Sequence, residues 1–522
     1  MKPIPFIEKF TNGDDLKEFA FAQQKNGFYL GKFHPDHDRS GEAGIEDDRH
    51  VFVLAGNRAG KGTTILIQNL LRWTPDENGK GGGIFCIDPK GENASITACA
   101  RGDELTARKW GSRVTHCMNQ KVAILDPLGT VKGPARAYVR KYNPFIDVDI
   151  DDHDGAAGEM ETACEAIVMQ EEGSGAHWTE SASTILSGTI EWALHTQPRE
   201  KVTWPYIRKL IFDGLRQPLD RERDYSTPFT RQLAEVETPE GLSQAASAII
   251  EGAGANERGS FQTTLMRQLK WLNDRRMTAH LEGDGFSLKQ AILENWAVYV
   301  CIPPGMINRF RRWLRLMVGI ALDAKTQSPF DHEGPQTLFM LDEFAALGSF
   351  SQIESGASNL AGYGVKLVTV IQNIGQLEKT YERNWETFLG NAGVIIAWAL
   401  NDKASEDYIS QRVGQSMDLV QSMSSSMNEK VTENDAFDAE PDKPAGARTG
   451  VTESYSYQPL PILWPNEVRE YGGRGEMRGF IITAEGKTFT TLRVPYYDRA
   501  VAGRFDSPEF IKEWEEKRPS KL

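Results

Sequence analysis

Short, strongly apolar segments recur along the chain and are separated by longer segments with helical spacing. Each apolar segment has the length of a buried strand rather than that of a helix. Several of them end in polar or glycine-rich residues. Because strands that alternate with helices form a parallel sheet with its site at their carboxyl ends, the pattern predicts an α/β fold, a parallel sheet flanked by helices. The predicted strands are His50–Leu54, Gly83–Ile87, Val122–Leu125, Trp296–Ile302, Thr337–Leu341, Lys366–Ile371 and Val394–Leu400.

The middle of the chain, residues 151–285, has a different pattern, because strand signals fade and helical spacing dominates. The clearest helical segments are Ser181–Leu194, Leu242–Glu251 and Phe261–Leu272. We therefore predict an all-α domain inserted into the sheet domain. Its tryptophans are expected to fill the core of that insertion rather than to stack on bases. They are Trp178, Trp192, Trp204 and Trp271.

After the last strand of the parallel pattern, residues 422–457 are rich in Ser, Met, Asn, Glu, Asp and Pro. Few large apolar residues occur there, which is typical of a mobile loop or linker. Apolar spacing returns in Gly479–Thr483 and Thr488–Val494, a predicted hairpin with Glu485-Gly486 at its turn. A charged helix, Pro508–Lys517, is predicted to follow.

The composition is that of a globular protein of 522 residues with a formal net charge of −14. This charge argues against a surface that coats duplex DNA, since such binding depends on neutralised phosphates, but it allows a local basic channel. The five cysteines have no metal-ligand spacing, so neither a disulfide framework nor a zinc site is expected. The N-terminus has no signal-peptide pattern, and the longest apolar runs fall short of the about 20 residues that cross a bilayer. We expect a cytoplasmic chain without a transmembrane helix.

A glycine-rich loop joins the first predicted strand to a helix-competent segment, which is the context of a phosphate-binding loop. Its backbone amides can surround phosphates, and Lys61 can contact the transferring phosphoryl group. The usual pattern is met imperfectly, since Ala55 replaces the first glycine and Gly62 replaces the magnesium-binding hydroxyl. Thr63 or Thr64 would supply that hydroxyl, and an ordinary glycine-rich turn is the alternative for the motif alone. The predicted nucleotide-binding residues are Gly56, Asn57, Arg58, Ala59, Gly60, Lys61, Gly62, Thr63 and Thr64.

Two adjacent carboxylates, Asp342 and Glu343, directly follow the buried strand Thr337–Leu341. Acidic pairs in such a place are costly unless they serve a function. We expect Asp342, with Thr63, to hold Mg²⁺, and Glu343 to polarise the water that attacks the terminal phosphate of ATP. A simple helix start is the alternative for this pair alone, but its combination with the phosphate loop favours a RecA-like P-loop fold.

Other strand ends carry further candidates. Gln372 is predicted to sense the γ-phosphate as a third catalytic residue beside Lys61 and Glu343, although Gln372-Asn373 is also compatible with a simple turn. Asp88 and Lys90 lie in a similar place and are equally compatible with a solvated turn. If neighbouring subunits share sites, a trans-acting arginine is needed, and the sequence does not choose among its candidates. These are Arg58, Arg383 and Arg412.

Four motifs resemble, in the same order, those of the TraG/VirD coupling-protein ATPases of conjugation and type IV secretion, which are relatives of the FtsK/HerA translocases. The loop Asn57–Gly62 is similar to the family's R-S-G-K-G loop, in which glycine also follows lysine. Ile87–Glu92 resembles its DPKGE segment, and Leu341–Gly348 its LDEF-x-x-LG box. Gln372, with Gln376-Leu377 and Leu389-Gly390-Asn391, resembles the next block.

The resemblance implies an ATP- and Mg²⁺-dependent hexameric motor. Such a motor delivers relaxase-bound DNA or protein substrates to a secretion channel. Its members usually carry two N-terminal transmembrane helices, which are absent from this sequence, so we expect recruitment by relaxase or secretion components to the cytoplasmic face of the inner membrane. The alternatives are a cytoplasmic DNA translocase acting in plasmid maintenance, packaging or defence, and a nucleotide-switched substrate adaptor. The sequence does not choose between DNA and protein cargo.

The predicted organisation combines these features. It comprises an N-terminal segment (1–46), the first part of a nucleotide-binding domain (47–150), the all-α insertion (151–285), the second part of the nucleotide-binding domain (286–421), a mobile loop or linker (422–457), and a C-terminal part of the nucleotide-binding domain with the hairpin and terminal helix (458–522).

Overall fold

A mixed 12-stranded sheet runs through the molecule, in the order β2-β1-β14-β13-β10-β3-β9-β8-β4-β7-β5-β6. This computed structural model describes residues 9–24, 26–76, 81–152, 155–169, 176–215, 228–238, 241–328, 335–356, 359–427, 449–498, 501 and 503–517. Neighbouring strands from β10 to β6 are parallel. They are β10 (Ala392–Trp398), β3 (His50–Ala55), β9 (Val365–Ile371), β8 (Thr337–Leu341), β4 (Ile84–Asp88), β7 (Ala297–Cys301), β5 (Val122–Leu125) and β6 (Val139–Arg140).

The predicted α/β fold is confirmed, and the seven strands predicted in the parallel part lie within two residues of their expected bounds. The predicted hairpin is formed by β13 (Arg478–Thr483) and β14 (Thr488–Leu492), which pair antiparallel to each other. Two strands were missed in the N-terminal segment. They are β1 (Phe28–Phe33) and β2 (Glu42–Ile45), which extend the sheet beyond β14.

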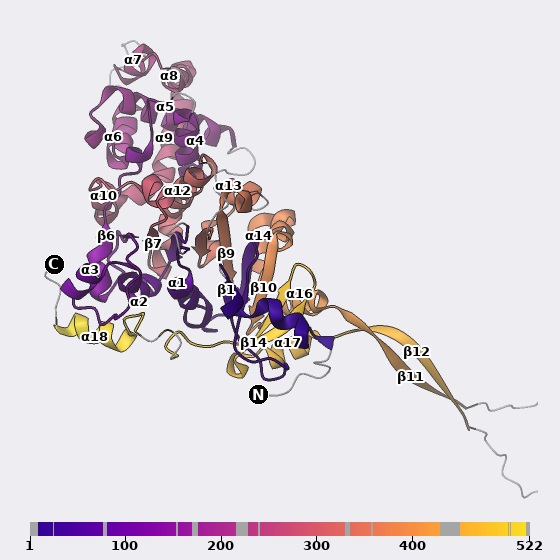
Figure 1. Cartoon of the computed structure of the whole chain (residues 1–522). Helices are drawn as coiled ribbons and strands as arrows, with labels where there is room; N and C mark the ends of the chain where they lie inside the picture. Colours follow the sequence, from indigo (N-terminus) through magenta and orange to yellow (C-terminus); the bar gives the residue numbers. More distant parts are fainter. Residues whose placement is uncertain are drawn as a thin grey trace, which may run out of the picture.

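Helices cover both faces of the sheet, and each face has its own apolar core (Figure 1). Successive residues of a strand point to opposite faces. On β3, Val51 and Val53 therefore pack into one core, together with Leu70 of α1 and Ala98 of α2, whereas Phe52 packs into the other. The helices around the sheet are α1 (Ile67–Arg72), α2 (Glu92–Arg101), α3 (Glu104–Lys109), α12 (Ile307–Thr326), α13 (Ser351–Gly356), α14 (Ile374–Tyr381), α15 (Glu386–Gly390), α16 (Lys403–Val413), α17 (Pro465–Tyr471) and α18 (Pro508–Lys517).

Between β6 and β7, every regular element in the described residues is a helix. Much of this segment stands above the sheet as a group of helices (Figure 1). Three of the four tryptophans there are buried, and Trp204 and Trp271 lie edge to face with ring centroids 6.3 Å apart. These tryptophans therefore belong to the core, as expected. The helices are α4 (Ala156–Ile167), α5 (Ala176–Thr196), α6 (Trp204–Gly214), α7 (Pro228–Glu235), α8 (Leu242–Gly252), α9 (Ala255–Gln268), α10 (Arg275–His280) and α11 (Leu288–Leu293).

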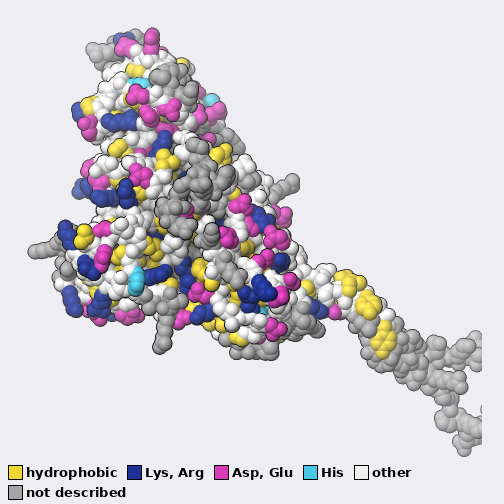
Figure 2. Space-filling model, in the orientation of Figure 1, with side chains coloured by type: hydrophobic (Ala, Val, Ile, Leu, Met, Phe, Trp, Pro, Cys, Tyr) yellow, Lys and Arg dark blue, Asp and Glu magenta, His cyan; other side chains and the backbone are white. Residues whose placement is uncertain are grey.

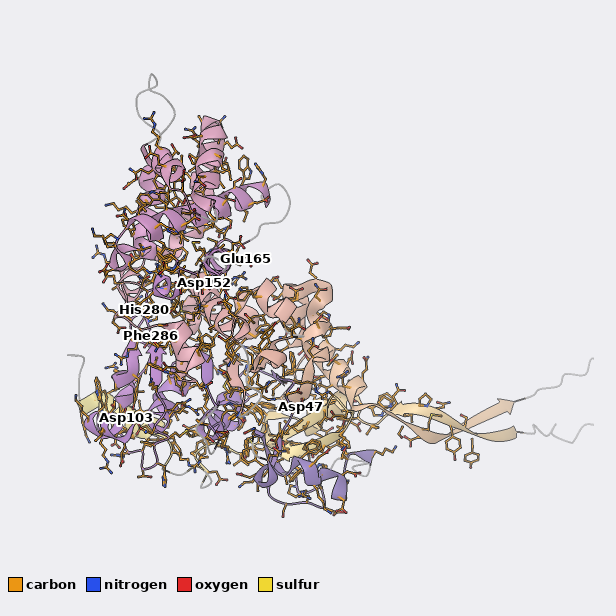
Figure 3. The ribbon with its side chains drawn as sticks, turned by 45° about the horizontal axis from the view of Figure 1, so that its top comes forward. Asp47, Asp103, Asp152, Glu165, His280 and Phe286 are labelled. Atoms are coloured by element: carbon orange, nitrogen blue, oxygen red, sulfur yellow. The ribbon has the colours of Figure 1, made fainter. Side chains whose placement is uncertain are left out.

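Phe286 and Glu165 lie near the place where the helical segment meets the sheet (Figure 3). Phe286 lies between Tyr142 and Trp296, with ring centroids 5.7 and 5.8 Å away. Arg315 of α12 is 5% exposed and donates to the carbonyls of Glu165 on α4 and Ser349 after β8. The guanidinium of Arg315 therefore ties the insertion to the loop that follows the carboxylate pair.

The region expected to be a loop or linker, residues 422–457, differs from that expectation. Its described ends belong to a two-stranded antiparallel ribbon, β11 (Gln415–Met427) and β12 (Thr449–Pro461), which projects from the body (Figure 1). The polar composition concealed a two-residue alternation, and strand pairing satisfies the backbone without a large apolar core. Residues 428–448 lie outside the described part of the chain.

Among the described residues, no helix combines the length and the apolar character needed to cross a bilayer.

Candidate nucleotide-binding site

The topology brings four candidate segments to one edge of the sheet. The glycine-rich loop follows β3, Gln372 follows β9, the carboxylate pair follows β8, and Asp88 ends β4. These strands are neighbours in the order β3-β9-β8-β4 and run parallel, so all four segments lie at their carboxyl ends. The parallel sheet thus assembles, from distant parts of the sequence, the site predicted at this edge.

The loop is fixed by the end of β10 and by the residues after β14. The carbonyl of Ala59 accepts hydrogen bonds from Nε1 of Trp398 (2.8 Å) and from the guanidinium of Arg493 (2.7 Å). The amide of Tyr496 donates to the carbonyl of Thr63 (2.8 Å). At Gly56 a Cβ atom would lie 2.1 Å from the carbonyl oxygen of Ala399, so only glycine fits there. The loop is therefore held in shape by its neighbours in the fold.

The two candidate hydroxyls for Mg²⁺ differ in position. Both Thr63 and Thr64 donate through Oγ1 to the carbonyl of Gly60, at 3.0 and 2.9 Å. Thr64 is 2% exposed and packs away from the cavity, whereas Thr63 lines it. The geometry favours Thr63, because only its side chain can exchange the Gly60 contact for one to a bound ion.

A cavity of about 430 Å³ lies over these strand ends. Residues 57–63 of the loop form one wall, and Asp88, Lys90, Asp342 and Glu343 form another. Arg474 and Tyr496 also line it and were not predicted, since they follow no motif and reach the site only through the fold. The cavity has the size of a small-molecule site and combines backbone amides, cations and carboxylates, the groups that a magnesium nucleotide requires.

Two carboxyl groups face this cavity from adjacent strands, the buried Asp88 and the half-buried Asp342. Ile87 of β4 is paired with Leu341 of β8. Asp88 and Asp342 are the next residues of the two chain segments and therefore lie side by side.

Burial raises the pKa of Asp88 to about 7 and that of Asp342 to about 6. The carboxylate of Asp342 adds to the rise in the Asp88 pKa, and that of Glu343 adds to the rise in the Asp342 pKa. The positive charge of Lys61 opposes the rise in the Asp342 pKa. A nearby divalent cation would stabilise the ionised form of both carboxyl groups, and carboxylates are ligands of Mg²⁺, so these residues fit this ion.

Glu343 and Gln372 are in direct contact. Nε2 of Gln372 donates to both carboxylate oxygens of Glu343, at 3.0 and 3.1 Å. Glu343 has a left-handed backbone conformation (φ 60°), which is uncommon for a residue with a side chain and occurs often at functional sites. Oδ1 of Asn373 accepts a hydrogen bond from the amide of Gln376 (3.0 Å) and so caps α14. The local structural role expected of a simple turn at Gln372-Asn373 therefore belongs to Asn373, not to Gln372.

The three arginine candidates fall in different places. Arg58 lines the cavity of its own chain and has a φ of 54°. Arg412 is exposed on α16, with its guanidinium 6.0 Å from the ring centroid of Tyr408. The side chain of Arg383 lies outside the described part of the structure. Arg58 thus lies at the cavity of its own chain, whereas Arg412 is open to solvent.

Comparison with known proteins identifies the family. The family model described as type IV secretory system conjugative DNA transfer matches residues 9–520. The chain belongs to this family. Among its relatives are a conjugal transfer protein TraG of Escherichia coli, 25% identical over 70% of this chain, and a VirD4 protein of Rhizobium radiobacter, 26% identical over 70% of this chain. The matches cover 55% and 48% of those two relatives, so the chain spans about half of their length.

Solved structures agree with the fold. The plasmid coupling protein TrwB in complex with ADP and Mg²⁺ is 14% identical, has a TM-score of 0.61, and the match covers 95% of each chain. An unbound form of the bacterial conjugative coupling protein TrwB without its first 70 residues gives a TM-score of 0.60 over 93% of this chain and 91% of that chain. The RecA-like fold is therefore shared.

Proposed function

We propose that this chain is an ATP-hydrolysing motor that acts as a coupling protein of type IV secretion, moving DNA or relaxase-bound DNA and protein substrates toward a secretion channel. The observation that carries the proposal is the convergence of the phosphate loop, Asp342 and Glu343 on one cavity in a member of the conjugative DNA-transfer family, with Gln372 hydrogen-bonded to Glu343. The TrwB structure with ADP and Mg²⁺ supports a magnesium nucleotide as the ligand.

The proposed reaction gives roles to the phosphate loop, to the carboxylates at the cavity and to Gln372. The amides of residues 57–63 and the ammonium group of Lys61 bind the phosphates. Asp342 and Thr63 hold Mg²⁺, which neutralises phosphate charge when bound. Glu343 orients the attacking water and accepts its proton, and Gln372 holds the Glu343 carboxylate in place. Asp88 adds a second carboxylate beside Asp342.

The partners and location are part of the same proposal. They are DNA or a relaxase–DNA complex as cargo, secretion components that recruit the chain from the cytoplasm to the inner membrane, and a ring of six copies. Neighbouring RecA-like subunits in a ring can share sites, which would give Arg412 or another exposed arginine a role in trans.

ATP turnover of the purified full chain, measured with and without single- and double-stranded DNA, tests the proposal. We expect DNA to stimulate a rate that Lys61→Ala and Glu343→Gln both remove, with Glu343→Gln still binding nucleotide. Hydrolysis without DNA stimulation would point to protein cargo or a missing partner. Tight nucleotide binding without hydrolysis under any condition would contradict a motor and favour a nucleotide-switched adaptor.

A further inference from the structure

The turn between α17 and β13 carries an arginine that lines the nucleotide cavity. Residues 472–475 have the sequence Gly-Gly-Arg-Gly, and Arg474 begins a short 3₁₀ helix, Arg474–Glu476, ahead of β13. Arg474 lines the cavity together with the phosphate loop and the carboxylates at the strand ends. We call residues 472–476 the arginine turn. It follows no motif, so only the fold reveals that its cation belongs to this cavity.

The side chain of Arg493 joins the arginine turn to the phosphate loop. One terminal nitrogen of this guanidinium donates to the carbonyl of Ala59 (2.7 Å), and the other donates to the carbonyl of Arg474 (3.2 Å). The backbone amide of Arg493 donates to the carbonyl of Met477 (2.8 Å), directly beyond the turn. Arg493 is only 3% exposed, so water does not compete for these bonds. One buried arginine therefore fixes the spacing between the phosphate loop and the backbone of Arg474.

A second connection to the phosphate loop runs through Ala399, directly after β10. Its amide donates to the carbonyl of Gly472 (2.7 Å), at the start of the arginine turn. Its carbonyl oxygen lies against Gly56, where an added Cβ would be 2.1 Å away. Both ends of the turn are thus tied to residues that contact the phosphate loop, and the fold sets the backbone position of Arg474.

The side chain of Arg474, unlike its backbone, has no partner among the described residues. The nearby Arg478 is buried and donates to the carbonyl of Tyr471 (3.2 Å) and to the carboxylate of Asp36 (3.0 Å). Arg474 is exposed, and within the described part of the chain its guanidinium forms neither a hydrogen bond nor an ion pair. An arginine that lines a cavity with its donors unused is available to a ligand.

The surroundings of Arg474 favour phosphate as that ligand. The carbonyls of Arg474 and Ala59 bind the same guanidinium, so the arginine turn lies beside residues 57–63, whose amides can surround phosphates. Guanidinium groups bind phosphate oxygens through paired, charge-assisted hydrogen bonds. The formal net charge is −14, and on the face drawn in Figure 2 basic and acidic side chains are interspersed over the body. A nucleotide is therefore attracted by the cations of the cavity rather than by the overall charge.

We propose that Arg474 binds the phosphates of the nucleotide in its own subunit, as a cation that the C-terminal part of the fold adds to the phosphate loop. The inference rests on the proposed function, because it concerns the ligand of the same site. Lys61 contacts the phosphates from the loop itself, and Arg474 contacts them from a separate segment. Arg493 holds loop and turn together, so the backbones that carry both cations are in place before the nucleotide binds, which lowers the entropic cost of binding.

Equilibrium binding of fluorescent ADP and GDP analogues to the full chain, with Mg²⁺ present, tests the inference. We expect Arg474→Ala to weaken binding of both analogues by a similar factor of about ten, because both carry the same phosphates. Arg469→Ala is the matched control, since this arginine of α17 is 59% exposed and does not line the cavity, and both affinities should be unchanged. Affinities of Arg474→Ala equal to those of the wild type would overturn the inference. A loss confined to one analogue would assign Arg474 to the base and overturn its contact with phosphate.

Thermal unfolding shows whether Arg474 acts on the ligand or on the fold. Without nucleotide, Arg474→Ala should have the wild-type midpoint, because its side chain has no partner among the described residues. With ADP and Mg²⁺ present, the rise in its midpoint should be smaller than that of the wild type. A midpoint that is lowered equally with and without nucleotide would assign Arg474 to the fold and overturn the inference.

The same measurements separate this inference from the proposed motor. A wild type that binds neither analogue would overturn the nucleotide site and the role of Arg474 together. A wild type that binds both, with Arg474→Ala binding equally well, would overturn the role of Arg474 alone. Binding that depends on Arg474, without ATP turnover under any condition, would support the inference and contradict the motor.

Discussion

Gln372→Ala should lower the rate of ATP hydrolysis while leaving nucleotide binding nearly unchanged. The side chain of Gln372 donates to both carboxylate oxygens of Glu343, at 3.0 and 3.1 Å, and does not line the cavity. Hydrogen bonds to a charged group contribute about 1.5–3 kcal/mol. With one donor group shared between two oxygens, we expect a loss of about 2–3 kcal/mol in the transition state, which is roughly a 30- to 150-fold lower kcat.

The assay is steady-state ATP turnover together with equilibrium binding of a fluorescent ADP analogue. A positioning role predicts a lower kcat with KM and Kd within about twofold of wild type. Gln290→Ala provides the control, because Gln290 donates to Glu294 in an exposed pair outside the cavity and its loss should leave kcat unchanged. A raised KM with unchanged kcat for Gln372→Ala, or an equal loss of kcat for Gln290→Ala, would refute the reasoning.

Three further predictions follow from the geometry of the site. Arg493→Met removes the donor to the Ala59 carbonyl (2.7 Å) and should weaken binding of the ADP analogue about tenfold. Arg108→Met, at a side chain that is 75% exposed, should not change this affinity. Equal Kd values for the two variants would argue against a role of Arg493 in holding the phosphate loop. Gly56→Ala should lower the thermal midpoint by about 5 °C or more, because its Cβ would lie 2.1 Å from the Ala399 carbonyl, whereas Gly62→Ala, with no atom within 4 Å, should keep the midpoint. The pKa of Asp88 is raised from an ordinary value near 3.8 to about 7 in the folded state, so the folded state binds this proton more tightly than the unfolded state. The free energy of unfolding without nucleotide should therefore fall as the pH rises from about 4 to about 7. Denaturant titrations at several pH values should show a smaller fall for Asp88→Asn, and an identical pH dependence would contradict the assignment.

The parallel strands could be predicted because their physics is local. β4, β7, β8 and β3 are buried at every position, which gives unbroken apolar runs, and the polar residues that follow them mark the edge where the site forms. The Glu343–Gln372 contact was only partly predictable. Both residues could be placed at strand ends, but their contact requires β9 to lie beside β8, which the sequence does not encode locally.

Other features depend on long-range packing. Within β1, Gly31 breaks the apolar pattern, yet a Cβ there would lie 2.5 Å from the Leu492 carbonyl, so the glycine is needed for the pairing with β14. Arg474 and Tyr496 reach the cavity through the C-terminal fold. The ribbon had a readable alternation in Met417, Leu419 and Tyr457, but its polar composition outweighed that signal in the sequence analysis.

The anchoring of the phosphate loop has a consequence for the order of events during synthesis. The loop leaves the ribosome early, but the carbonyls of Ala59 and Thr63 meet all of their partners, Trp398, Arg493 and Tyr496, only after residue 496 has been translated. Until then the growing chain carries an intact phosphate-loop motif without all of the contacts that shape it. Nucleotide affinity should therefore appear only after these residues have been translated, and ribosome-bound chains that end before residue 490 should fail to retain ATP.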